Sequence, residues 1–185
     1  GVKLVVSTWP TINENSENYE YMSKNDMLIK TTRSSDRVFD FYGPQAEIDA
    51  TNPKTRSFVF NKLKENYLDN GVDALWFDEA EPEIHPEYFD ELVFHIGRGG
   101  EVALIYPYYY LKMAYDGFKS LGVDAPVTLT RCAYLGSQKF GALVWSGDIP
   151  STFESLSAQV KAGLNMSLCG IPWYCMTTVP ARGIP

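Results

Sequence analysis

The sequence predicts an α/β fold, namely part of a (β/α)8 barrel with about five strand–helix units in a single domain. Short apolar segments alternate with helical segments, a polar or aromatic residue follows each expected strand, and no glycine-rich phosphate loop follows any of them. A doubly wound sheet shows the same alternation and is the alternative. A complete barrel takes about 250 residues, so the 185 residues present are expected to be a piece of a longer chain that lacks some strands.

The first half of the chain contains two expected strands and one expected helix. Residues 3–8 (KLVVST) are compact and β-branched, which predicts a strand. The next forty residues are polar, aromatic and turn-rich without a clear period, so we expect a long functional loop there. A capping residue followed by proline at 51–53 begins a helix that Asn70-Gly71 closes. Residues 74–77 (ALWF) then predict the second strand.

The second half continues the same alternation. Helical spacing and capping residues predict helices at 106–121 and 151–164, and apolar runs predict strands at 127–130, 142–145 and 167–173. The aromatic residues of the first of these helices are expected to pack in the core. Strands that alternate with helices in this way indicate a parallel sheet.

Composition and charge exclude several classes of partner. Sixteen basic and 23 acidic residues give a formal net charge of −7, which disfavours nucleic acid because such binding depends on Lys and Arg that neutralise phosphates. No apolar run approaches the roughly 20 residues that cross a bilayer, so no membrane partner is expected.

The cysteines and histidines predict neither a metal site nor a cofactor. The three cysteines have spacings that match no zinc pattern, and we expect reduced, buried thiols. This favours a cytoplasmic location, while any targeting signal would lie outside these residues. Only His85 and His95 are present, and neither lies near a plausible nucleophile in the sequence. Catalysis is therefore expected to depend on carboxylates.

The segment ALWFDEAEPE delivers several acids to the end of a buried strand. Hydrolysis of a glycoside needs two carboxyl groups that flank one sugar. Asp78 and Asp148 are the expected pair, since each lies just beyond a predicted strand. Glu79 and Glu83 are expected to lie in a solvated acidic loop.

Two blocks of the sequence resemble glycoside hydrolase family 31, the retaining α-glycosidases that include α-glucosidases and α-xylosidases. WFDEAEPE after GVDAL is similar to the family's W-x-D-x-x-E-P motif, and RCAYLGSQKFGALVWSGD is similar to the later block that begins with Arg and closes in W-x-G-D. The resemblance implies that Asp78 is the nucleophile and that Asp148 is the general acid/base. It covers the chain from residue 1 to about Trp173.

The resemblance also implies that Trp9, Arg131 and Trp145 bind substrate, and other residues near strand ends are added to this set. Tryptophans near strand ends suit sugar rings, because their faces are apolar while the hydroxyls of the sugar seek polar partners. The residues expected to bind substrate are Trp9, Trp76, Glu81, Arg131, Trp145 and Trp173.

The chain departs from the family pattern near its end. Where the family shows a sequence of the type W-x-x-D-I-G-G-F, this chain reads WYCMTTVPARGIP. The expected Asp and paired glycines are absent, which puts the last dozen residues in doubt as family sequence.

The resemblance implies a retaining hydrolase of α-glucosides or α-xylosides. An α-transglycosylase and a non-catalytic carbohydrate-binding or interaction fragment are the alternatives. The expected partner is an oligosaccharide or glycoside, and the chain is expected to associate with itself or with the missing parts of its parent, because open barrel edges expose unpaired backbone.

Overall fold

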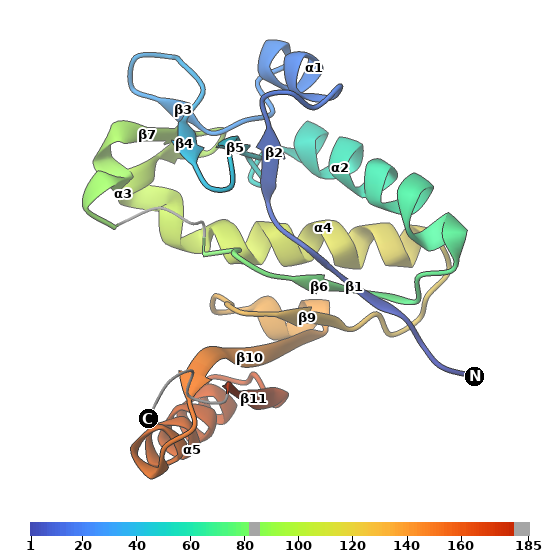
Figure 1. The fold of residues 1–185 in the computed structure, drawn as a ribbon, viewed down its shortest axis with the longest axis vertical. Coiled ribbons are helices and arrows are strands. Elements are labelled where there is room, and N and C mark those ends of the chain that lie inside the picture. Colours follow the sequence, from blue (N-terminus) through green and yellow to red (C-terminus); the bar gives the residue numbers. More distant parts are fainter. Residues whose placement is uncertain (82–85, 180–185) are drawn as a thin grey trace.

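The computed structural model describes residues 1–81 and 86–179, in which a central parallel sheet carries helices and two smaller antiparallel sheets (Figure 1). The central sheet is formed, in spatial order, by β1 (Val5–Thr8), β6 (Ala74–Phe77), β9 (Thr128–Thr130), β10 (Ala142–Pro150) and β11 (Tyr174–Val179). All of its pairings are parallel. Neighbouring strands in the sheet are also successive among the central strands along the chain. The predicted parallel α/β architecture is therefore confirmed, and the chain supplies five strands of the eight that a barrel has.

Helices occupy the connections between the central strands. The α-helices are α1 (Tyr19–Lys24), α2 (Pro53–Asn66), α3 (Gly99–Val102), α4 (Tyr106–Ser120) and α5 (Phe153–Leu168), and the 3-10 helices are η1 (Leu68–Asn70), η2 (Pro86–Glu91), η3 (Ala103–Ile105) and η4 (Ser137–Phe140). Helix α2 precedes β6, α4 precedes β9 and α5 precedes β11, whereas only the short η4 lies between β9 and β10. In Figure 1, α2 and α4 lie beside β1 and β6, and α5 lies beside β10 and β11 at the other end of the curved sheet.

Local sequence accounts for the ends of the helix α2. The Asn52 side chain accepts a hydrogen bond from the Lys54 N–H at 2.9 Å, and Pro53 occupies the first turn, where its missing N–H is not needed. After the short η1, Gly71 takes φ 93°, a left-handed conformation that favours glycine. The chain then turns into β6.

Helix α4 packs against the sheet through its aromatic residues, as predicted. Tyr106 and Tyr110 are almost completely buried. The Tyr110 ring stacks on Phe77 with the centroids 4.1 Å apart. The Tyr106 hydroxyl donates to the Ile48 carbonyl at 2.8 Å, so its polar end is satisfied inside the core. These tyrosines are core residues and do not form a sugar platform.

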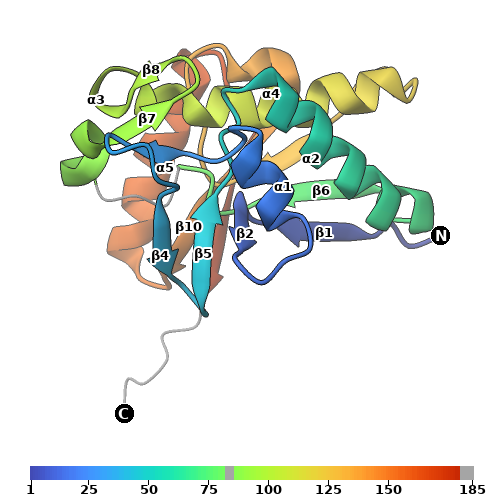
Figure 2. The same cartoon turned by 90° about the horizontal axis from the view of Figure 1, so that it is seen from above.

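The forty residues after β1 are not the structureless loop that the sequence predicts. They contain α1 and the strands β2 (Thr11–Asn13), β3 (Lys30–Thr31), β4 (Val38–Asp40) and β5 (Pro44–Glu47). One small sheet has the order β2-β5-β4, and the other joins β3 to β7 (Leu92–Phe94) and β8 (Gly97–Arg98). Figure 2 shows the β2-β5-β4 sheet beside the carboxyl end of β1.

Two predicted boundaries near the end of the chain are wrong. Strand β10 continues past residue 145 to Pro150, because a bulge between Trp145 and Asp148 lets it pair further along β11. The predicted strand at 167–173 does not form, since α5 runs to Leu168 and Gly170 then turns the chain with φ 81°. The fifth strand is β11, so the first part of the divergent last dozen residues pairs with β10.

The three cysteines are free thiols, but the expectation of burial is wrong for Cys169, which is exposed at the end of α5. None of the described helices is long and apolar enough to cross a membrane.

Candidate active site

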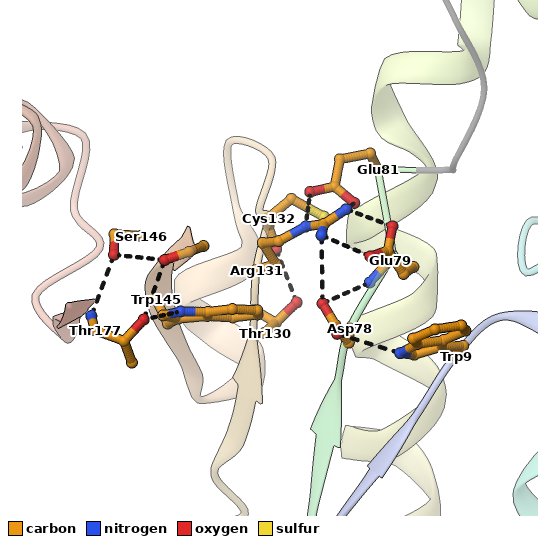
Figure 3. Close-up of polar contacts among 11 residues, drawn as sticks. Trp9, Asp78, Glu79, Glu81, Thr130, Arg131, Cys132, Trp145, Ser146 and Thr177 are labelled. Carbon is orange, nitrogen blue, oxygen red and sulfur yellow. Dashed lines mark hydrogen bonds and ion pairs between the residues drawn. The ribbon is translucent and has the colours of Figure 1, made fainter. Parts of the chain in front are cut away.

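Three neighbouring strands of the central sheet have their carboxyl ends side by side, and the residue after each strand belongs to one cluster (Figure 3). Trp9 follows β1, Asp78 follows β6 and Arg131 follows β9. Backbone hydrogen bonds align these residues: the Asp78 N–H donates to the Thr8 carbonyl at 3.1 Å, and the Arg131 N–H donates to the Phe77 carbonyl at 3.3 Å. The pairing of parallel strands thus brings together side chains that are far apart in the sequence.

The Asp78 carboxylate is held from three directions. The Trp9 indole Nε1–H donates to Oδ2 at 3.2 Å, and the Glu79 backbone N–H donates to Oδ1 at 3.0 Å. The Arg131 Nη1 lies 3.6 Å from the same Oδ1. The Asp78 side chain is 15% exposed, so it is mostly shielded yet open to a ligand.

Arg131 is held by two glutamates through a fork of charge-assisted hydrogen bonds. Its Nη1 and Nη2 donate to the two carboxylate oxygens of Glu79 at 2.7 and 2.6 Å. Its Nε and Nη2 donate to the two oxygens of Glu81 at 2.7 and 2.9 Å. The hydrogen bonds to Glu81, and then those to Glu79, outweigh partial burial and hold the pKa of Arg131 well above its ordinary value.

Glu79 is a site residue that the sequence prediction missed. Its side chain is only 14% exposed and pairs with Arg131, so the expectation of a solvated acidic loop is wrong for this residue. Its backbone takes φ 52°, an uncommon left-handed conformation for a residue other than Gly, Asn or Asp. The only signal in the sequence was the spacing of two glutamates after Asp78. Glu83 and His85 lie outside the described residues.

Trp76 of β6 and Trp145 of β10 meet edge to face, with ring centroids 5.1 Å apart and an interplanar angle of 86°. The Trp145 indole N–H donates to the Thr177 hydroxyl at 2.9 Å, which ties β10 to β11 (Figure 3). Trp145 is 5% exposed. Trp173 is exposed and directly precedes β11.

Asp148 lies on the bulged part of β10 and is exposed. Gly147, the residue before it, takes φ 73° and packs beside Arg131, since a methyl group at Gly147 would lie 3.6 Å from the Arg131 Cδ. The bulge therefore brings the backbone next to Asp148 against the same arginine that approaches Asp78. Within the described residues, no group of three His, Cys, Asp or Glu side chains is arranged to hold a metal ion.

Comparison with known proteins identifies the family to which this cluster of strand-end residues belongs. The "Glycosyl hydrolases family 31 TIM-barrel domain" matches residues 1–178. The chain belongs to glycoside hydrolase family 31. The match extends into β11, so it includes most of the strand that the divergent final sequence forms.

Relatives in family 31 are similar over nearly the whole of this chain. An uncharacterised family 31 glucosidase, ORF2, from Pseudescherichia vulneris is 41% identical over 94% of the chain and 33% of its own length. An α-xylosidase from Saccharolobus solfataricus is 31% identical over 96% of the chain and 23% of its own length. The chain thus spans about a third or less of these relatives.

A solved structure has the same fold. The family 31 α-xylosidase from a soil metagenome, complexed with xylose, superposes with a TM-score of 0.92 at 42% identity, over 98% of this chain and 27% of its own. The segment is accordingly part of a (β/α)8 barrel.

Proposed function

We propose that the full-length gene product hydrolyses α-xylosides or α-glucosides with retention of configuration, with Asp78 as nucleophile and Asp148 as general acid/base. The observation that carries the proposal is the fixed, mostly shielded Asp78 carboxylate at the carboxyl edge of the sheet, between Trp9 and Arg131. In barrel enzymes this edge is where catalytic groups are found. The α-xylosidases and glucosidase among the relatives support this substrate class.

In the proposed mechanism Asp78 forms the bond to the sugar and Asp148 transfers the protons. An ionised Asp78 oxygen attacks the anomeric carbon while the glycosidic C–O bond breaks, and Asp148 gives its proton to the departing oxygen. Asp148 then removes a proton from water, whose oxygen displaces Asp78 from the sugar. Because Trp9 and the Glu79 amide hold the nucleophile in place, little reorganisation is needed at the moment of attack.

The exposed position of Asp148 suits its proposed role, because an acid/base must exchange protons with water between the two steps. Retention requires the two carboxyl groups to lie about 5–5.5 Å apart around the sugar, whereas inversion requires roughly 6.5–9.5 Å. A crystal structure of the gene product with bound xylose would measure this separation. A separation far beyond both ranges would contradict the assignment of the pair.

Hydrolysis of 4-nitrophenyl α-xyloside and α-glucoside by the full-length gene product tests the function. Proton NMR of the first-formed sugar should show the α-anomer, and the ratio of the two kcat/KM values would set the preference between xyloside and glucoside. Release of the β-anomer first would contradict the covalent mechanism. Transfer of the sugar to a second sugar in preference to water would indicate a transglycosylase, and absence of turnover would favour a non-catalytic carbohydrate-binding role.

A further inference from the structure

Tyr110 of α4 packs against the end of the strand that carries Asp78. Helix α4 runs alongside β6 (Figure 1), and the Tyr110 ring stacks on Phe77 with centroids 4.1 Å apart and an interplanar angle of 20°. Phe77 ends β6 and directly precedes Asp78. Tyr110 is only 1% exposed. The buried tyrosine therefore contacts the residue next to the proposed nucleophile.

The hydroxyl group of Tyr110 lies near the end of β1. Thr8 ends β1 and is the partner of Phe77 in the parallel register, so the two side chains lie on the same face of the sheet. The Thr8 Oγ1 is buried and makes no well-formed hydrogen bond within the described part of the chain. Burial raises the pKa of Tyr110, whereas the nearby Thr8 hydroxyl lowers it. The Tyr110 side chain thus spans from the end of β6 to the end of β1.

Two of the contacts that hold Asp78 come from the end of β1. The Asp78 N–H donates to the Thr8 carbonyl at 3.1 Å, and the Trp9 indole N–H donates to the Asp78 Oδ2 at 3.2 Å. Within the described chain, β6 is the only neighbour of β1 in the central sheet. A shift of β1 relative to β6 would disturb both contacts, and a displacement of about 1 Å can slow a reaction roughly 100-fold.

We propose that Tyr110 is a positioning residue, which holds the end of β1 against the end of β6 and thereby fixes the Asp78 carboxylate for attack. This inference rests on the proposed function and adds to it a residue that does not touch the substrate. Because Tyr110 is almost completely enclosed, it acts on the reaction through its neighbours Thr8 and Phe77. Removal of such a group lowers the rate of the chemical step and leaves the binding of substrate intact.

The test removes each of the two hydroxyl groups in the full-length gene product. Tyr110→Phe keeps the ring that stacks on Phe77. Thr8→Val keeps a branched side chain of similar shape and the backbone carbonyl that accepts from Asp78. The double variant measures whether the two hydroxyls act together.

Two further variants are matched controls. Tyr106→Phe removes a buried hydroxyl about one turn earlier on α4, where it donates to the Ile48 carbonyl at 2.8 Å. Thr128→Val removes a buried threonine hydroxyl at the start of β9, away from the carboxyl ends of the strands.

The kinetics are measured on the 4-nitrophenyl α-glycoside that the parent protein hydrolyses. Tyr110→Phe and Thr8→Val should each lower kcat and kcat/KM equally, by roughly tenfold. The double variant should lose no more than either single variant, because both changes break one contact. No loss in the single variants, additive losses in the double variant, or losses that arise through KM would overturn the positioning role and leave the proposed function in place.

Both controls should leave kcat and KM unchanged. Tyr106→Phe should nevertheless lower Tm by at least as much as Tyr110→Phe, since it leaves the Ile48 carbonyl without its partner. If Tyr106→Phe lowers kcat as much as Tyr110→Phe does, the effect is a general loosening of α4 and the positioning role is wrong. If the parent protein hydrolyses neither the α-xyloside nor the α-glucoside, the proposed function fails and the positioning role with it.

Discussion

Asp78 and Asp148 occupy different surroundings, which suit them to different steps of one reaction. Asp78 is mostly shielded and accepts hydrogen bonds from Trp9 and from the Glu79 amide, whereas Asp148 is exposed on a strand bulge. A carboxylate that donors hold in one position is well placed to act as a nucleophile. A carboxyl group that reaches water can take up and release a proton in each cycle.

This difference predicts opposite responses to the removal of each acid. Asp148→Ala should lose most activity on substrates with poor leaving groups and keep part of it on aryl or fluoride glycosides, which leave without an acid. Azide should restore turnover and give an α-glycosyl azide of retained configuration. Asp78→Ala should show neither effect, because no covalent intermediate can form. NMR of the azide product provides the measurement, and the reverse pattern would exchange the two roles.

Glu79 is expected to control the distance between Arg131 and Asp78. Glu79→Gln removes one of the two glutamates that hold the guanidinium, which can then shorten its 3.6 Å ion pair with Asp78 to hydrogen-bond distance. An ion-paired carboxylate is a weaker nucleophile, so kcat should fall by roughly tenfold, equivalent to about 1.4 kcal/mol, with little change in KM. Steady-state kinetics on an α-glycoside measure the two constants separately.

Glu65→Gln is the matched control for Glu79→Gln. Glu65 also forms an ion pair, with Lys62 at 3.1 Å, but its side chain is 58% exposed near the end of α2 that precedes β6. Its loss should leave kcat and KM unchanged. If the two variants behave alike, the Glu79–Arg131 pair has no part in positioning the site.

The sequence predicted the site residues that strand pairing places, but not the one that a side-chain contact places. Trp9, Asp78 and Arg131 directly follow strands that were predicted, and the parallel sheet necessarily brings such residues to one edge. The role of Glu79 depends on a left-handed backbone and on an arginine 52 residues away. Hydrophobic periodicity predicts neither the left-handed backbone nor the contact with Arg131, so the sequence indicated a solvent-exposed Glu79.

At the scale of elements, polar side chains of α1 and β3 converge on Asp36. Lys30 of β3 donates to the Asp36 Oδ1 at 2.6 Å, and the Tyr19 hydroxyl of α1 donates to Oδ2 at 3.2 Å. Ser23, also on α1, donates to the same Oδ2. Burial alone would raise the pKa of Asp36, but the bonds from Lys30, Ser23 and Tyr19 prevail and lower it. Burial and the nearby Asp36 charge raise the pKa of Tyr19 to about 12.

Asp36→Asn should therefore destabilise this region at neutral pH. Because the folded-state pKa is lowered, the carboxylate stabilises the protein above its unfolded-state pKa of about 4, and that stability is lost as the pH falls below this value. The free energy of unfolding at pH 7 should fall by about 1–3 kcal/mol, since Lys30 loses the closer and more buried of its two charged partners. Urea unfolding at pH 7 and at pH 3 should show a smaller difference between variant and parent at the lower pH.

The exposed ion pair of Asp69 provides the control for Asp36→Asn. Asp69 pairs with Lys64 at 2.7 Å but is half exposed. Asp69→Asn should change the free energy of unfolding by less than about 1 kcal/mol at either pH. Equal effects of the two substitutions would mean that the Asp36 cluster does not join α1 to β3.

The elements that the sequence predicted and those it missed differ in length and in the range of their pairing. Strands β1 and β6 are compact apolar runs, so local composition identified them. Strands β2 to β5 have two to four residues each, too few to show a period, and β2 and β3 pair with strands far along the chain, as in Thr11 with Glu47. Helix α5 was cut short because the apolar residues up to Leu168 also fit a strand.

At the scale of the whole molecule, the sheet has two open edges and one helix with an uncovered face. Strands β1 and β11 each have a neighbour on one side only within the described chain. No residue of α5 is buried. Its exposed apolar side chains recur at helical spacing and form a stripe, namely Phe153, Leu156, Val160, Leu164 and Leu168. An apolar stripe of this length usually packs against another element.

The chain of 185 residues is therefore expected to associate with itself when it is isolated, through the stripe on α5. Val160→Lys combined with Leu164→Lys should weaken association by at least about tenfold, because covering one aliphatic side chain contributes about 1.5–3 kcal/mol. Lysine makes the test strict. The chain has a net charge of −7, so an added positive charge lowers the repulsion between copies and by itself would promote association. Ala158→Lys on the flank of the same helix is the control and should leave association unchanged. Sedimentation velocity over a range of concentrations measures the effect. A monomer with a sharp thermal transition would mean that neither the stripe nor the open edges need a partner.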